Sequence, residues 1–296
     1  MSAVPSFAAR VRAAAERNNS LACVGLDPHI ERFPSALQTR ARHDLAGAIV
    51  EFNRAIIDAT VDLVCAYKPN LGFYLAHGLA GMEALARTRA AIPAHIPVIL
   101  DAKVNDMGNT AEAYAVGYFD HFGFDAVTLS PYLGADTLLP FLARPGRGIF
   151  ILCRTSNPSA GELQDLAVLP FGAGEGGPNL TGSLPLYQRM AQQIAAWAER
   201  FDASGACGAV TGATYTQELA TVRAILPRAP LLIPGVGEQG GSVGEAVRAG
   251  IDAEGFGAII TASRSITYAS GGADFAEAAR DATVTLRDAI NAARPR

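Results

Sequence analysis

The stretch IPVILDAKVNDMGNT, residues 96–110, contains the pattern that decides the fold. Its first residues form a short continuous apolar run, and charged and polar residues follow directly. Continuous apolar runs of this length are typical of parallel strands that are buried on both faces. Residues 105–122 then show Ala, Glu and aromatic side chains at helical spacing. The stretch therefore predicts a strand followed by a helix.

The same pattern recurs along the chain. Eight apolar runs end in polar or glycine-rich residues: LACVGLD (21–27), VDLVCAYKPN (61–70), IPVILDAK (96–103), FDAVTLSP (124–131), GIFILCRTS (148–156), GACGAVTG (205–212), PLLIPGVG (230–237) and GFGAIITAS (255–263). Helices are expected between them, among others at 44–61, 105–122, 184–201 and 274–293. Eight strand–helix units indicate an α/β fold of the (β/α)8 TIM-barrel type. An open doubly wound sheet would gather its polar residues mainly at one switch point, whereas here they follow nearly every run.

We expect a single barrel domain over residues 1–296. Residues 1–20 have an arginine-bearing amphipathic pattern without an apolar signal core, which predicts a leading helix and not an export signal. A long connection at about 154–183 follows the fifth run. Loops longer than about 12–15 residues are usually functional or disordered. No segment reads as a linker to a second domain.

Composition excludes several classes of protein. Lys and Arg number 24 against 28 Asp and Glu, a net charge of −4, which argues against a generally basic nucleic-acid binder. No run of about 18 apolar residues is present, so no membrane span is expected. The four cysteines form no CxxC pair and lie in or beside apolar runs. This usage predicts buried, reduced thiols in a cytoplasmic protein.

The densest group of charges follows the run at 96–103. Asp101 and Lys103 are two residues apart at a strand end, so their side chains are expected on the same side. Asp106 comes next, and Thr110 lies four residues further on, which predicts one shared helix face. An ordinary salt bridge and a helix N-terminal charge are the alternatives. Charges at the mouth of a barrel cost desolvation free energy unless they serve one another or a ligand.

Lys68 ends the second run, in the sequence AYKPN. Neighbouring strands of a barrel end side by side, so Lys68 is expected near Asp101 and Lys103, in an alternating array of lysines and aspartates. The carboxylates would keep both lysines protonated. The alternative is a lysine whose charged end reaches solvent while its stem lies on apolar surface.

Two other strand ends carry candidate ligand-binding residues. Asp27 in VGLDPH can accept two hydrogen bonds from a sugar diol, or it can cap a loop. Ser156, with Asn157, opens the long connection and can bind the polar edge of a ring, or it can begin a turn before Pro158.

A phosphate site is predicted after the seventh and eighth runs, where TIM barrels commonly bind phosphate. The segment PGVGEQGG at 234–241 offers backbone N–H groups and the amide of Gln239. Arg264 in ASRSIT can contact a phosphate through two N–H groups. A bare turn is the alternative for the glycine segment on its own.

In this order and spacing the motifs GLDP, YKPN, DAKxxDxGNT, TSNP, PGVGxQGG and SRSIT closely resemble orotidine 5′-phosphate decarboxylase, above all its longer bacterial branch. The resemblance runs from about residue 19 to residue 269. It implies a homodimeric barrel that converts orotidine 5′-monophosphate (OMP) to uridine 5′-monophosphate (UMP) and CO₂ in pyrimidine biosynthesis. It also implies that no metal and no organic cofactor take part.

The resemblance assigns roles to the charged residues. Lys68, Asp101, Lys103 and Asp106 match the family's charged tetrad, and Asp106 and Thr110 match positions that the family lends across the dimer interface. Lys103 would stabilise a carbanion at C6 of the pyrimidine ring and then protonate it.

The same resemblance assigns the binding residues. Asp27 matches the ribose-binding carboxylate, Ser156 the serine that binds the pyrimidine, and Gln239 and Arg264 the phosphate-binding pair. Two positions depart from the family pattern. Glu238 replaces a residue that is often small, and Ser263 stands where many members have glycine, so the geometry of the phosphate loop is in question.

Three other functions compete with this one. Sugar-phosphate decarboxylases and aldolases of the same extended barrel family use a divalent metal at an Asp-x-Lys-x-x-Asp strand end. A Schiff-base aldolase would use Lys68 or Lys103 as a nucleophile, but neighbouring carboxylates raise the pKa of a lysine and disfavour that role. A non-catalytic phosphate-ligand module is the third.

Overall fold

The computed structural model describes residues 4–169, 182–201, 203, 205–236 and 242–295. Its main sheet has eight strands, and all pairings within it are parallel. The strands are β1 (Ala22–Gly25), β2 (Ala66–Lys68), β3 (Ile99–Val104), β4 (Ala126–Leu129), β5 (Gly148–Arg154), β8 (Cys207–Thr211), β9 (Leu231–Pro234) and β10 (Ala258–Ala262). Each of the eight predicted apolar runs coincides with one of them, and only β3 extends beyond its run, by the single residue Val104.

The sheet closes on itself. Its order is β2-β1-β10-β9-β8-β5-β4-β3, and parallel bridges from Tyr67 to Val98 and from Asn70 to Asp101 join the two end strands. At this seam the Asp101 N–H donates to the Pro69 carbonyl at 2.9 Å. The predicted TIM barrel is therefore confirmed. Its extent as one domain over residues 1–296 stays a prediction.

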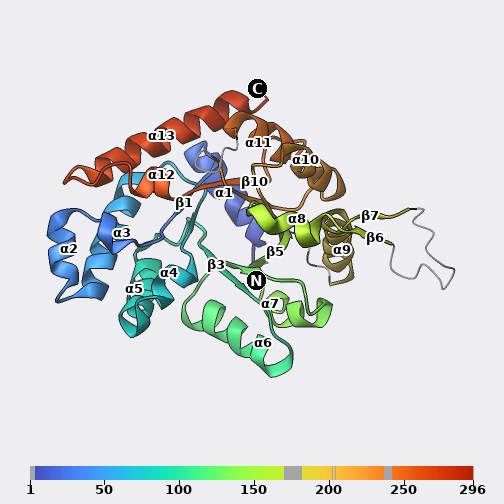
Figure 1. Ribbon diagram of the computed structural model, residues 1–296, viewed down its shortest axis with the longest axis horizontal. Coiled ribbons are helices and arrows are strands. Elements are labelled where there is room, and N and C mark those ends of the chain that lie inside the picture. The colour runs from blue at the N-terminus through green and yellow to red at the C-terminus, as the bar shows by residue number, and fades with distance from the viewer. Residues whose placement is uncertain (1–3, 170–181, 202, 204, 237–241, 296) are drawn as a thin grey trace.

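Helices surround the strands (Figure 1). The outer ring follows the strands in chain order: α3 (Leu45–Thr60), α5 (Gly78–Ala91), α6 (Gly108–Ala115), α7 (Leu139–Leu142), α9 (Leu186–Arg200), α10 (Thr216–Ile225), α11 (Val243–Gly250) and α13 (Phe275–Ala293). Shorter helices lie in the connections: α2 (Ser35–Ala41), α4 (Leu71–Leu75), α8 (Gly161–Gln164) and α12 (Arg264–Thr267). Among the described residues, no helix has the length and apolarity that crossing a membrane requires.

The predicted leading helix is present as α1 (Phe7–Asn18), and the side chain of Ser6 accepts a hydrogen bond from the Ala9 N–H at its start. Part of the long connection after β5 is a two-stranded antiparallel hairpin of β6 (Ala167–Val168) and β7 (Leu184–Pro185). In Figure 1 this hairpin reaches outward from the barrel.

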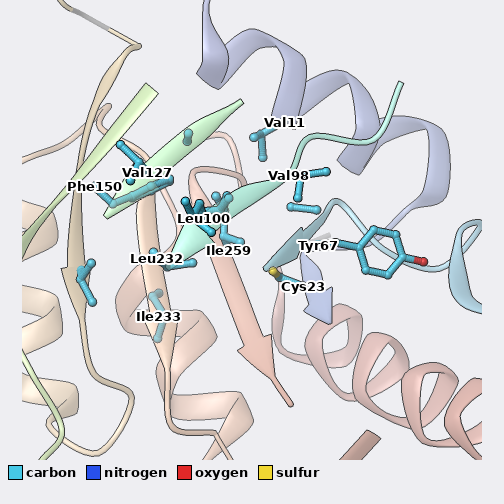
Figure 2. Close-up of a cluster of buried hydrophobic side chains, with 14 of the residues drawn as sticks. Val11, Cys23, Tyr67, Val98, Leu100, Val127, Phe150, Leu232, Ile233 and Ile259 are labelled. Atoms are coloured by element: carbon cyan, nitrogen blue, oxygen red, sulfur yellow. The ribbon is translucent and has the colours of Figure 1, made fainter. Parts of the chain in front are cut away.

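The core is one large cluster of buried side chains from the strands and the inner faces of the helices. Figure 2 shows part of it, with Leu100 of β3, Val127 of β4, Phe150 of β5 and Leu232 of β9. All four are at most 2% exposed. The four cysteines are buried and form no disulfide, as their apolar surroundings predict. Burial also raises the pKa of the Cys153 and Cys207 thiols to about 12.

Two predicted helices begin later than their sequence patterns indicate. The helix expected at 105–122 begins at Gly108 and passes into a π-helical segment at Val116–His121. Asp106 therefore precedes the helix, and the prediction that it shares a helix face with Thr110 is wrong. The helix expected at 184–201 begins at Leu186, because residues 184–185 pair with β6.

Candidate active site

A cavity of about 680 Å³ lies at the carboxyl ends of the strands. Six of the nine predicted site residues line it, and they come from strand ends that are far apart in the sequence: Asp27, Lys68, Asp101, Lys103, Ser156 and Arg264. Since parallel strands end at the same edge of a barrel, closure of the barrel brings these residues together. These six side chains therefore share one cavity, as expected of strand ends, and the roles assigned to them stay predictions.

Asp101 is the centre of the charged group. Its Oδ2 atom accepts hydrogen bonds from Lys68 Nζ and from Asn70 Nδ2, both at 3.1 Å. Its Oδ1 atom contacts Lys103 Nζ at 2.5 Å and accepts from Thr128 Oγ1 at 3.0 Å. A carboxylate with four donors is fully engaged, so Asp101 orients its neighbours and is not available as a base.

The charges in this group stabilise one another. Burial alone would lower the pKa of Lys68, but the charges of Asp101 and Asp27 outweigh burial and raise it. Burial alone would raise the pKa of Asp101, but Lys68 and Lys103 outweigh it and hold that pKa well below its usual range. The side chain of Lys68 is 6% exposed and that of Lys103 is 44% exposed. Lys68 is thus a buried fixed charge, whereas Lys103 is the accessible ammonium group.

Asp101 and Lys103, which were expected on the same side of the strand, are in direct contact, but regular strand alternation is not the cause. Lys103 has a φ of 51°, in the left-handed region, and the pairing of β3 with β4 shifts register between Leu100 and Val104. The strand bulges at the residues that carry the charges. Such bulges commonly redirect a side chain beside an active site.

Asp27 lies next to the charged group, and Asn70 connects the two. Asp27 is 8% exposed, and its Oδ1 atom accepts a hydrogen bond from the Asn70 N–H at 3.0 Å. Asn70 therefore contacts Asp27 through its backbone and Asp101 through its side chain. The sequence prediction did not assign Asn70 to the site, although it ends the motif YKPN; its position directly after Lys68 was the available signal.

Ser156 lies in a segment whose side chains form a chain of hydrogen bonds, in which each bond fixes the donor and the acceptor of the next. The Thr155 N–H donates to Gln164 Oε1 at 2.8 Å, which leaves the Gln164 amide nitrogen to donate to Thr155 Oγ1 at 2.8 Å. Thr155 Oγ1 in turn donates to Asn157 Oδ1 at 2.6 Å. All four residues line the cavity. Gln164 was not predicted, because nothing in the sequence indicates that α8 folds back onto residues 155–157.

Arg264, which was predicted to bind a phosphate, is the first residue of α12 and lines the cavity. The neighbouring Ser263 packs against β1. A Cβ atom added to Gly25 would lie 1.8 Å from Ser263 Oγ, so the serine is accommodated by a glycine on the adjacent strand. Gln239 and Glu238, which were predicted to act at and near the phosphate, lie outside the described residues.

Asp106 and Thr110 do not line the cavity of their own chain. Asp106 is half-buried, and its Oδ1 atom accepts a hydrogen bond from the Met107 N–H at 2.8 Å. Thr110 is exposed near the start of α6. Within the described ranges, no three His, Cys, Asp or Glu side chains are grouped as metal ligands would be.

Known proteins share both sequence and architecture with this chain. The model of the orotidine 5′-phosphate decarboxylase / HUMPS family matches residues 20–173. The orotidine 5′-phosphate decarboxylase of Thermomicrobium roseum is 50% identical over 98% of this chain and 96% of its own length. That of an Azoarcus species is 47% identical over 97% and 99%. The solved structure of Leishmania donovani OMP decarboxylase covers 98% of both chains at 36% identity, with a TM-score of 0.78. This chain therefore belongs to the orotidine 5′-phosphate decarboxylase / HUMPS family.

Proposed function

We propose that this chain catalyses the decarboxylation of OMP to UMP and CO₂ in the cytoplasm. The observation that carries the proposal is the array of Lys68, Asp101 and Lys103 in a cavity that Asp27 and Arg264 also line. Such an array provides a fixed positive charge beside groups suited to a ribose and a phosphate.

Substrate binding orients the pyrimidine ring over the lysines. Asp27 accepts hydrogen bonds from the ribose hydroxyls, and Ser156 binds the polar edge of the pyrimidine. Arg264, together with Gln239, binds the phosphate. Because these contacts are remote from the scissile bond, their binding free energy can position the reacting carbon.

The chemical step is electrostatic. The bond between C6 and the carboxylate breaks, CO₂ leaves, and the electron pair remains on C6. Lys103 stabilises this developing charge and then delivers a proton from Nζ to C6. Asp101 positions Lys103, and Lys68 balances the charge of Asp101. Neither a metal ion nor an organic cofactor has a role in this scheme.

The direct test is the loss of OMP absorbance on addition of the purified chain, measured with and without a metal chelator. We expect turnover at the same rate in both conditions. Turnover that disappears with chelator and returns with a divalent metal would support the metal-dependent alternative. Binding of UMP without any turnover of OMP would support the non-catalytic alternative.

We further propose a homodimer in which Asp106 and Thr110 of each subunit complete the cavity of the other. A second hollow of about 440 Å³, lined by Asp101, Lys103, Tyr114 and Tyr118 among others, adjoins the charged array. Large apolar side chains are exposed in α4, at the start of α5 and in the segments that follow β3 and β4, which favours a covered surface: Leu75, Leu79, Met107 and Tyr132.

Subunit mixing tests the shared site. Lys103→Ala and Asp106→Ala are each expected to be inactive. In a mixed dimer one site carries both defects and the other carries neither, so about half the activity of one wild-type dimer should return. If subunits are shown to exchange and no activity returns, each site is built from a single chain.

A further inference from the structure

The pairing of β3 with β4 is irregular at the charged array. Leu100 pairs with Val127 and Val104 pairs with Leu129, so three residues of β3 lie opposite the single residue Thr128 of β4. Those three residues are 101–103, and they include both ends of the contact between Asp101 and Lys103. Two extra residues in one strand leave backbone groups without their usual partners in the ladder.

The side chain of Thr128 replaces those partners. Its Oγ1 atom accepts hydrogen bonds from the Ala102 N–H at 3.0 Å and from the Lys103 N–H at 2.9 Å. The same hydroxyl donates to Asp101 Oδ1 at 3.0 Å. A hydroxyl has one proton and two lone pairs, so its whole hydrogen-bonding capacity is used on three consecutive residues. Thr128 is fully buried, at 0% exposure.

These bonds determine how Lys103 is presented. A non-glycine residue with a φ of 51° needs surroundings that hold it there, because that conformation is disfavoured for L-residues. The hydroxyl binds the Lys103 N–H and also the carboxylate oxygen that contacts Lys103 Nζ. The Lys103 N–H and the carboxylate oxygen that contacts Lys103 Nζ are therefore both hydrogen-bonded to the same atom, Thr128 Oγ1 of β4.

Threonine is common in strands for packing reasons alone, because β-branched side chains fit a pleated surface. Thr211 of β8 is such a case. It is also 0% exposed, but its Oγ1 atom has no hydrogen-bond partner among the described residues. Thr128 and Thr211 are thus both fully buried strand threonines, but only the hydroxyl of Thr128 has hydrogen-bond partners among the described residues.

We infer that Thr128 is a positioning residue of the decarboxylation, and that its hydroxyl, by holding the bulge in β3, directs Lys103 into the cavity. The inference rests on the proposed function. Thr128 acts through Lys103 and Asp101, so its loss should reduce the rate of the chemical step and leave nucleotide affinity nearly unchanged.

The experiment compares Thr128→Val, which removes the hydroxyl at nearly constant volume, with Thr128→Ser, which keeps it. Thr211→Val is the matched control, because the same change is made at a buried threonine without hydrogen bonds. We would measure kcat and KM for OMP, the Kd for UMP and the urea midpoint. For Thr128→Val we expect kcat at least about 100-fold below that of Thr211→Val, since a displacement of about 1 Å costs that much. The Kd for UMP should change by less than about threefold, and Thr128→Ser should recover kcat to within about tenfold of wild type.

Several results would overturn the inference. One is a kcat for Thr128→Val within about tenfold of Thr211→Val, a difference of only about 1.4 kcal/mol in barrier. Another is an equal loss of kcat and UMP affinity that serine does not restore. If the valine variant does not fold, Thr128→Ala against Thr128→Ser makes the same comparison of one oxygen atom, and equal kcat values would again contradict the inference. A wild-type chain without OMP turnover would remove the proposed function and the inference together, whereas an active wild type with an active Thr128→Val removes the inference alone.

Discussion

Two aspartates with largely buried side chains, at opposite ends of the barrel strands, are each surrounded by cations. Asp101, near the carboxyl end of β3, contacts Lys68 and Lys103. Asp125 immediately precedes β4, and its side chain is 2% exposed. Its partners are three arginines and one backbone N–H: Arg10 at 2.6 Å, Arg147 at 3.1 Å, Arg89 at 3.3 Å and the Val98 N–H at 2.9 Å.

The cations of the two groups differ in what else they contact. Arg89 Nε also donates to the Gly123 carbonyl at 2.9 Å, and Arg147 Nη1 donates to the Phe124 carbonyl at 2.8 Å. Arg10 connects the leading helix α1 to the same carboxylate. These guanidinium groups crosslink backbone segments and do not release protons near neutral pH. Lys103, in contrast, presents a proton-bearing amine to a cavity.

A buried carboxylate among cations is therefore not by itself evidence of a functional site. Asp101 differs from Asp125 in two respects. It lies towards the carboxyl ends of the strands, and its partner Lys103 can exchange a proton with a ligand. If this distinction is correct, substitutions in the group around Asp101 should change turnover. Substitutions in the group around Asp125 should change the free energy of unfolding.

The largest effect is expected for Lys103→Ala. Loss of both charge stabilisation and the proton donor should lower kcat by about 10⁴-fold or more. UMP should still bind, because the ribose and phosphate contacts remain. Stopped-assay turnover of OMP and calorimetric titration with UMP would measure the two quantities. A variant that kept activity within about tenfold would exclude the proposed role of Lys103.

Asp125→Asn should have the next largest effect, and on a different quantity. Removing the carboxylate leaves three arginines without their common counter-charge, and breaking a buried ion pair costs about 3–5 kcal/mol. We expect a lower urea midpoint, with kcat per folded molecule within about threefold of wild type because the two groups share no partners. A folded variant that had lost most of its activity would contradict the distinction between the two aspartates.

Arg264→Ala tests the carboxyl end of the barrel for phosphate binding. A charge-assisted contact is worth about 1.5–3 kcal/mol, so the Kd for UMP should rise about 10- to 150-fold. The Kd for uridine, which has no phosphate, should change little. Arg147→Ala is the control at the opposite end and should leave both Kd values unchanged. Equal weakening of UMP and uridine by Arg264→Ala would place the phosphate elsewhere.

The smallest effect concerns pH. The pKa of Asp101 is lowered in the folded chain, so the stability it contributes is present above about pH 4 and is lost as the pH falls towards the folded value. The pKa of Lys68 is raised, so its contribution is present below about pH 10.4 and is lost as the pH rises through the folded value. Neither group titrates between pH 6 and 9, and we expect them to change kcat by less than about twofold there. A Lys68→Met variant with the wild-type acid and alkaline stability profile would show that the coupling is absent.

Much of the fold could be predicted because its signals are local. Short apolar runs that end in polar or glycine-rich residues mark each barrel strand and its carboxyl end without knowledge of any distant contact. The same locality identified Asp27, Lys68, Asp101 and Arg264, since each is in or next to the segment that ends a strand. Helix starts were less accurate: the pattern around Asp106 continues into α6, but backbone geometry begins the helix at Gly108.

The sequence by itself determined the eight barrel strands, the barrel and the side of it on which the polar residues gather, because periodicity and strand ends are properties of neighbouring residues. Only the tertiary structure decided which side chains meet. Thr128 reaches residues 101–103 across the β3–β4 pairing, Asn70 joins Asp27 to Asp101 across the closing seam, and three arginines converge on Asp125. Each of these contacts links positions 22 or more residues apart, and for Arg10 and Asp125 the separation is 115. Register, bulges and hydrogen-bond direction are set when strands pair, and no single segment contains that information.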